Sequence, residues 1–176
     1  MTKKEKPIKI LSIKPGTKHV ALAILDNQDL VYWVIIKIRF SVMEDSQVVK
    51  NLKYSLNKVI NFWKPNIIAV EDVFYTQSKK NQLLNFLIKN IKKFCKERKI
   101  KVYFYSPLLV RKYFCKKEKV NKINTAKIIA DLYPWLSEKY KREKKKRWYQ
   151  LKFGLRIFDA IAVGLFCHHQ LKKKKY

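Results

Sequence analysis

The sequence predicts an α/β fold, in which a mixed five-stranded sheet is flanked by helices on both faces. Three short apolar runs rich in β-branched residues open the chain, and helical and strand patterns alternate after them. The short turns "KPGT" and "DNQD" between these runs predict that the first three strands pair antiparallel. Since a long helical crossover follows the third run, the fourth strand must lie parallel to a strand already in the sheet.

The first half of the chain contains three strands and one helix. The strands are expected at residues 8–13, 19–25 and 30–38. The spacing of apolar residues then becomes helical over residues 44–63, and the dipeptide "KP" ends this helix. One face of the helix carries the apolar residues Val49, Leu52, Leu56, Val59, Ile60 and Trp63.

The second half of the chain continues the alternation of strands and helices. The continuous apolar run in "NIIAVEDVF" is typical of a strand that is covered on both faces. A second amphipathic helix is expected from about residue 79 to residue 98, and "KVYFYS" is the fifth strand. The remainder is helical, with "SPLLVRKYF", "NTAKIIADLY" and a last helix from about residue 152 to residue 171.

Length and composition predict one domain. A chain of 176 residues with 48% hydrophobic residues is long and apolar enough to bury a substantial core. We expect this domain to span residues 1–176, with a basic segment at 138–150 and a basic tail at 172–176.

The charge of the chain points to a polyanionic partner. The sequence has 41 Lys and Arg against 13 Asp and Glu, a formal net charge of +28. Nucleic acid is the polyanion that such an excess most often binds. A surface enriched in lysine by genome composition or by adaptation to heat is the alternative.

The cysteines and the N-terminal residues predict the cellular compartment of the protein. Cys95, Cys115 and Cys167 are widely spaced and form no CxxC pair, as expected of reduced thiols in the cytoplasm. The N-terminal "MTKKEKP" has no apolar signal region, and no stretch of about 18 apolar residues is present. We therefore expect a cytoplasmic protein that does not associate with membranes.

Three blocks of the chain resemble motifs of the RuvC-type Holliday junction resolvases, a family with the ribonuclease-H-like fold. The blocks are "LSIKPGTKHVALAIL", "IIAVEDVF" and "FDAIAVGLF", which are similar to the family motifs "IDPG", "IExVF" and "DAxA" in the same order. The resemblance implies a ribonuclease-H-like fold, branched DNA as the substrate and a homodimer as the functional unit.

The resemblance also implies a two-metal active site. In that family an Asp on the first strand, a Glu at the end of the fourth strand and two residues on the last helix hold two Mg²⁺ ions. The helix ligands are three residues apart, a spacing that puts both on one helix face. Two such ions stabilise the attacking and leaving oxygens of a phosphodiester. By the motif match, Glu71 is the strand acid and Asp159 is the second helix ligand.

The other two ligand positions depart from the family pattern. Lys14 stands at the position of the strand Asp, and Arg156 stands at the position of the first helix ligand. Neither side chain can bind a metal ion, because both are donors only. We therefore expect no metal cofactor. If any metal binds, its ligands are Glu71 and Asp159.

Charge balance offers a reason for both substitutions. Two carboxylates facing two cations make a neutral cluster without a metal ion, and a buried carboxylate pair is costly without such partners. The hypothesis is that Lys14 and Arg156 close the metal site of a former nuclease. The alternative is that Lys14 is an ordinary surface lysine at the end of a strand.

Two regions are candidates for nucleic-acid binding. The first region is the basic segment, in which side chains that would contact phosphates are followed by an aromatic ring that would stack on a base. These residues are Lys141, Arg142, Lys144, Lys145, Lys146, Arg147 and Trp148. By the resemblance, the aromatic pair Phe74 and Tyr75 lies where the family inserts a ring into the junction. The alternatives are a solvated charge run and a Phe74 ring that folds back onto the second helix.

Three functions therefore remain open from the sequence. The first is a RuvC-like protein that binds branched DNA and has lost or nearly lost cleavage. The second is an active endonuclease that uses Mg²⁺ or Mn²⁺ with an unusual ligand set. The third is an RNA-binding or ribosome-associated protein of the same superfamily.

Overall fold

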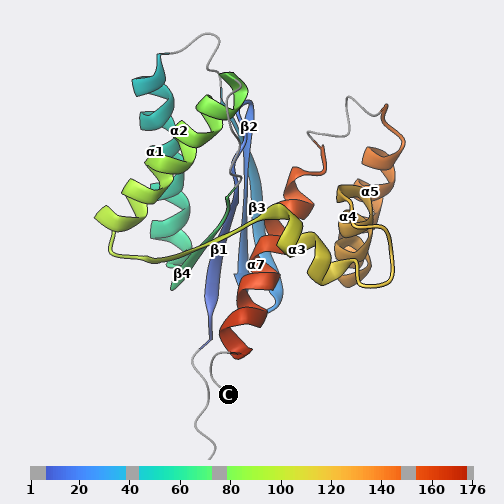
Figure 1. The fold of residues 1–176 in the computed structure, drawn as a ribbon. Helices are drawn as coiled ribbons and strands as arrows, with labels where there is room; N and C mark the ends of the chain where they lie inside the picture. Colours follow the sequence, from blue (N-terminus) through green and yellow to red (C-terminus); the bar gives the residue numbers. More distant parts are fainter. Residues whose placement is uncertain (1–6, 39–43, 73–78, 148–153, 174–176) are drawn as a thin grey trace, which may run out of the picture.

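The computed structural model describes residues 7–38, 44–72, 79–147 and 154–173 (Figure 1). The sheet has the order β3-β2-β1-β4-β5; β1, β2 and β3 pair antiparallel, whereas β1, β4 and β5 pair parallel. The mixed five-stranded sheet predicted by the sequence is thus confirmed. Its strands are β1 (Lys9–Lys14), β2 (His19–Asp26), β3 (Asp29–Lys37), β4 (Ile67–Glu71) and β5 (Lys101–Tyr105).

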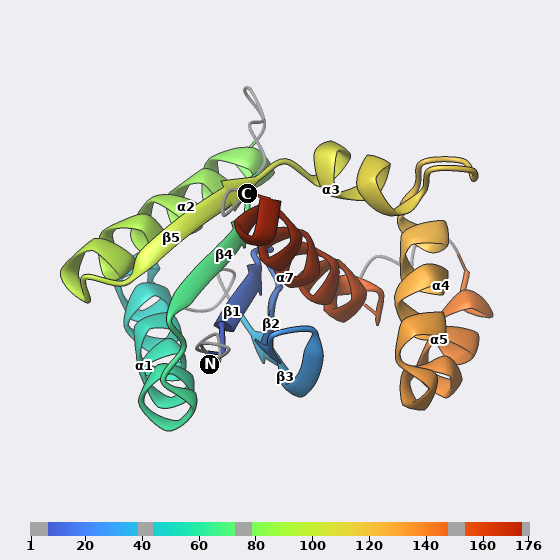
Figure 2. The ribbon, with the colours of Figure 1, turned by 90° about the horizontal axis from the view of Figure 1, so that it is seen from below.

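Helices cover both faces of this sheet. Figure 1 shows α1 and α2 on one face, and α7 on the other, with α4 and α5 beyond it. Figure 2 shows α7 lying between the sheet and the pair of α4 and α5. A 3-10 turn, Pro134–Leu136, joins α4 to α5. The helices are α1 (Asp45–Trp63), α2 (Lys79–Glu97), α3 (Pro107–Phe114), α4 (Lys122–Leu132), α5 (Ser137–Lys144) and α7 (Arg156–Lys173).

Alternation along the strands divides the core into two layers. Leu11 and Ile13 point toward α1 and α2, because side chains on a strand alternate between the two faces. The opposite face presents Ala21, Ala23 and Ala69 to α7. These small side chains let α7 lie close to the centre of the sheet, where its buried residues complete the second layer.

The same alternation brings two charged residues to the α7 face. Lys14 and Glu71 are the last residues of β1 and β4, and the parallel register pairs Ile13 with Val70 just before them. Asp72 follows Glu71 and turns to the other face, where its carboxylate accepts from Lys92 of α2 at 3.0 Å. The carboxyl ends of β1 and β4 therefore meet beside the first turn of α7.

One further property of the helices concerns membranes. Within the ranges that the structure describes, no helix is both long enough and apolar enough to span a lipid bilayer.

Candidate functional site

Lys14 and Glu71 form a buried ion pair. The Lys14 ammonium contacts the Oε1 atom of Glu71 across the β1–β4 register. The Glu71 side chain is 2% exposed and that of Lys14 is 12% exposed. The lysine predicted to replace a metal ligand therefore lies directly on the strand acid.

The electrostatics of Glu71 reflect this burial. Burial raises the pKa of the Glu71 carboxyl above its ordinary value, and the nearby Asp159 raises it further, whereas Lys14 lowers it. The effect of Asp159 shows that the two acids share one electrostatic environment. Lys14 is thus the main group that favours the ionised form of Glu71.

Asp159 is held by two cations that sequence reasoning did not single out. The carboxylate, 3% exposed, lies 2.9 Å from the Nζ atom of Lys122 and 3.6 Å from a guanidinium nitrogen of Arg111. Lys122 is the first residue of α4 and Arg111 lies in α3, both of which pack against α7. No sequence signal distinguishes them among the 41 basic residues, because their role depends on how α3 and α4 fold back.

Arg156 occupies the turn between β1 and β2. Its guanidinium donates to the backbone carbonyl oxygen of His19 at 3.4 Å. It also lies over Gly16, where a Cβ atom would come within 1.8 Å of a guanidinium nitrogen. Burial lowers the pKa of Arg156, and the carboxylates of Asp159 and Glu71 act in the opposite direction. Glycine at position 16 is therefore what makes room for this cation.

The six charged side chains will be called the cationic cluster. Their charges sum to +2, since four cations surround two carboxylates, and the neutrality expected from the sequence does not hold once α3 and α4 are included. The members of the cluster are Lys14, Glu71, Arg111, Lys122, Arg156 and Asp159.

The residues of the cluster do not fit a pair of magnesium ions. Mg²⁺ requires oxygen ligands in near-octahedral geometry, and only Glu71 and Asp159 present such oxygens here. Both carboxylates already contact ammonium or guanidinium groups. Among the residues with described positions, no three His, Cys, Asp or Glu side chains are grouped closely enough to hold a metal ion.

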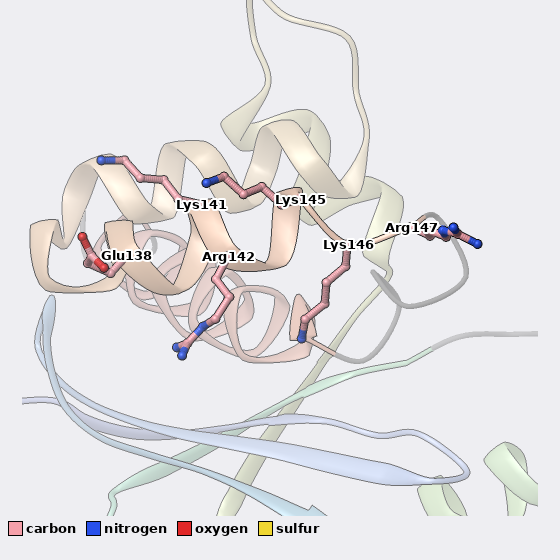
Figure 3. A pocket seen from close by; sticks show the side chains of 6 residues that line it. All are labelled: Glu138, Lys141, Arg142, Lys145, Lys146 and Arg147. Atoms are coloured by element: carbon pink, nitrogen blue, oxygen red, sulfur yellow. The ribbon is translucent and has the colours of Figure 1, made fainter.

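A second basic surface lies on α5. Figure 3 shows Lys141 and Lys145 pointing to one side of the helix, and Arg142 and Lys146 to another. Lys141 and Arg142 belong to the last turn of α5, whereas Lys145 and Lys146 follow the end of the helix at Lys144. With the single acid Glu138, they line a hollow at the surface. The name basic face of α5 is used here for Lys141 and Arg142 of α5 together with Lys145, Lys146 and Arg147, which follow the helix.

Two more residues of α5 differ in their surroundings. Lys144 is exposed and its ammonium lies 6.0 Å from the centroid of the Tyr140 ring. Glu143 is buried and accepts from Lys146 at 2.7 Å. A Cβ atom on Gly154 would lie 1.4 Å from the other carboxylate oxygen of Glu143. Because Gly154 stands two residues before Arg156, the end of α5 lies beside the first turn of α7.

Some predicted residues are not placed by the structure. Phe74, Tyr75 and Trp148 lie outside the described residues.

Comparison with known structures supports the fold. T. thermophilus RuvC in complex with a Holliday junction substrate matches with a TM-score of 0.71 at 17% identity, covering 96% of each chain. The yeast mitochondrial Holliday junction resolvase Ydc2 has a TM-score of 0.66 at 14% identity, covering 94% of this chain and 81% of that one. The Fowlpox virus resolvase with its junction DNA has a TM-score of 0.51 at 20% identity, covering 93% and 99%.

Comparison of sequences identifies the family. A search of curated proteins found no match. The sequence model described as crossover junction endodeoxyribonuclease RuvC matches residues 10–142, about three quarters of the chain. The resemblance read from the three motif blocks is confirmed, and the chain belongs to the RuvC family of crossover junction endodeoxyribonucleases.

Proposed function

We propose that this protein binds Holliday junction DNA and has lost the metal-dependent phosphodiester cleavage typical of RuvC resolvases. The observation that carries this proposal is the buried ion pair between Lys14 and Glu71. An ammonium group in contact with the strand acid takes the place that a divalent ion would need. Asp159 is likewise occupied by Lys122 and Arg111. The protein therefore functions without a resident metal ion.

Two surfaces support binding to DNA. The cationic cluster provides a net charge of +2, and the basic face of α5 adds five cations around one acid. The contact of Glu143 with Gly154 joins the end of α5 to the start of α7, so both surfaces can engage one duplex arm and its branch point. Phosphate contacts of this kind provide affinity, while the shape of the junction selects the substrate.

Symmetry supports a homodimer as the working unit. A four-way junction has an approximate two-fold axis, and two copies of one chain related by such an axis present the same site to both continuous strands. Analytical ultracentrifugation of the free protein and of its junction complex measures this directly. A single copy bound to each junction would contradict the dimer.

A cytoplasmic location is part of the same proposal. It is supported by Cys95, Cys115 and Cys167, which are free and buried as expected of reduced thiols.

A cleavage assay tests the loss of activity. A labelled four-way junction is incubated with excess protein and Mg²⁺ or Mn²⁺, and the expected result is an intact junction. Symmetrical nicks would show that the protein is an active endonuclease and would contradict the proposal. The double substitution Lys14→Asp with Arg156→Asp provides oxygen ligands at both altered positions, so manganese binding, measured by calorimetry, should appear in this variant alone.

A binding assay tests the substrate. Gel shifts with a junction, a linear duplex and a structured RNA are compared at several salt concentrations, since a basic protein binds all of them at low salt. The expected result is preferred binding to the junction at physiological salt. Equal binding to all three would exclude branch recognition, and preference for the RNA would indicate an RNA-binding function.

A further inference from the structure

The cationic cluster holds more positive charge than its own acids balance. Lys14 lies on Glu71, and Lys122 and Arg111 lie on Asp159. Arg156 is placed among these groups, where it interacts electrostatically with both acids. Four cations and two carboxylates therefore share one partly buried region, with an excess of two positive charges.

This excess makes the cluster unfavourable in the absence of an anion. The side chains of Lys14, Lys122 and Arg111 are only 12%, 25% and 27% exposed, so these cations lie close together with little solvent between them. The cations thus repel one another in a region from which water is partly excluded. An anion that entered the cluster would relieve this repulsion.

The cations are also held in place before any ligand arrives. The Arg156 guanidinium lies over Gly16 and donates to the His19 carbonyl oxygen at 3.4 Å. Lys122 is held by Asp159 at 2.9 Å, at the start of a helix that packs on α7. Binding a ligand usually costs free energy because long side chains must be ordered. Here the side chains are already ordered in the folded protein, so this cost on binding is small.

We propose that the cationic cluster is a metal-independent anion site that binds a single phosphate group of the DNA through Arg156 and Lys122. This inference rests on the proposed function, since it assumes that the protein binds a DNA junction. A guanidinium donates two hydrogen bonds to a phosphate, and an ammonium adds a charge-assisted bond. The excess charge of the cluster substitutes for that of divalent ions, so binding of this phosphate requires no metal.

Neutral phosphate analogues test the proposal. Junctions are prepared in which one phosphate at a time, near the branch point, is replaced by an uncharged methylphosphonate. In EDTA, the wild-type protein should lose about tenfold in affinity or more at one symmetry-related position, as expected for loss of a charge-assisted hydrogen bond. A scan in which no position stands out would overturn the proposal while leaving junction binding intact.

A double-variant cycle assigns the sensitive phosphate to the cluster. Arg156→Gln and Lys122→Gln should each weaken binding of the unmodified junction, but should cause little further loss when that phosphate is already neutral. Each should also reduce the slope of log K against log salt by about 0.9. Equal losses on the modified and unmodified junctions would contradict the assignment. If Arg156→Gln does not fold, Lys122→Gln decides the result.

Two controls separate this site from general electrostatics and from free anions. Lys53→Gln removes one charge near Glu97 on the opposite side of the sheet, and should leave the sensitive phosphate unchanged. Inorganic phosphate is added as a competitor, and should weaken binding of the unmodified junction more than binding of the modified one. Equal competition would contradict the anion site. If no junction binding is seen in any condition, the proposed function fails first.

Discussion

Replacing Lys14 by methionine is expected to destabilise the protein strongly. The substitution keeps much of the side-chain volume but removes the ammonium that contacts Glu71. Removing one partner of a buried ion pair costs about 3 to 5 kcal/mol, because Glu71 loses its contacting cation and keeps the weaker influence of Arg111 and Arg156. Glu71 is 2% exposed whereas Lys14 is 12% exposed, so we expect the lower end, about 3 kcal/mol.

Urea unfolding followed by circular dichroism measures this loss. With a slope of about 2 kcal/mol per M, the midpoint should fall by about 1.5 M. The double substitution Lys14→Met with Glu71→Met should recover most of the stability, because neither charge of this ion pair is then left buried without its partner. The matched control is Lys53→Met, whose partner Glu97 is 48% exposed, and it should cost less than about 1 kcal/mol.

The pH dependence provides a further check on the Lys14→Met variant. Burial raises the pKa of Glu71 above its ordinary value of 4.5, and loss of Lys14 would raise it more. At a pH between the pKa of Glu71 in the unfolded chain and its higher pKa in the folded protein, the folded protein binds more protons. The free energy of unfolding therefore falls as pH rises from the lower pKa to the higher one. The penalty should thus be small near pH 4.5 and grow toward neutral pH. A penalty that does not vary with pH, or an unchanged midpoint at neutral pH, would refute this reasoning.

Three other substitutions test the surroundings of the site. Gly16→Ala should cost about 1 to 3 kcal/mol in urea unfolding and weaken junction binding, because its Cβ would lie 2.6 Å from a backbone oxygen and 1.8 Å from Arg156; unchanged stability would contradict this packing. Gly154→Ala should destabilise in the same assay, since its Cβ would overlap the Glu143 carboxylate, and adding Glu143→Ala should relieve that effect. Additive losses would show that the two residues do not meet. Burial lowers the pKa of His168 from its ordinary value of 6.5, so the unfolded chain takes up a proton first and stability should fall as pH drops below about 6.5. His168→Leu should reduce the dependence of the melting temperature on pH. An unchanged pH dependence would show that it arises from other groups.

Most of the fold was predictable because it depends on local patterns. Period-two and helical spacing identified the strands and the long helices to within a few residues, and short turns established the antiparallel hairpins. Details that depend on packing were less accurate. Val48 rather than Val49 is buried on α1, since the exact face of a helix depends on where it meets the sheet.

The candidate site was predictable only in part, because some of its residues are brought together by packing and not by local patterns. Lys14 and Glu71 could be placed together because each follows an apolar strand and parallel strands end at one edge. Arg111 and Lys122 carry no such signal. They reach Asp159 through two short helices whose positions are set by packing against α7.

The sequence by itself determined the order of elements, the basic character of the chain and the presence of Lys14 and Arg156 where the motif match predicts oxygen ligands. These properties are local or compositional, so they can be read from residue types and their spacing. Only the tertiary structure decided that four cations rather than two surround the acids, and that the site therefore carries excess positive charge. Ion pairs between residues as distant in sequence as Lys122 and Asp159 depend on how helices pack, which is set by the shape of the whole core.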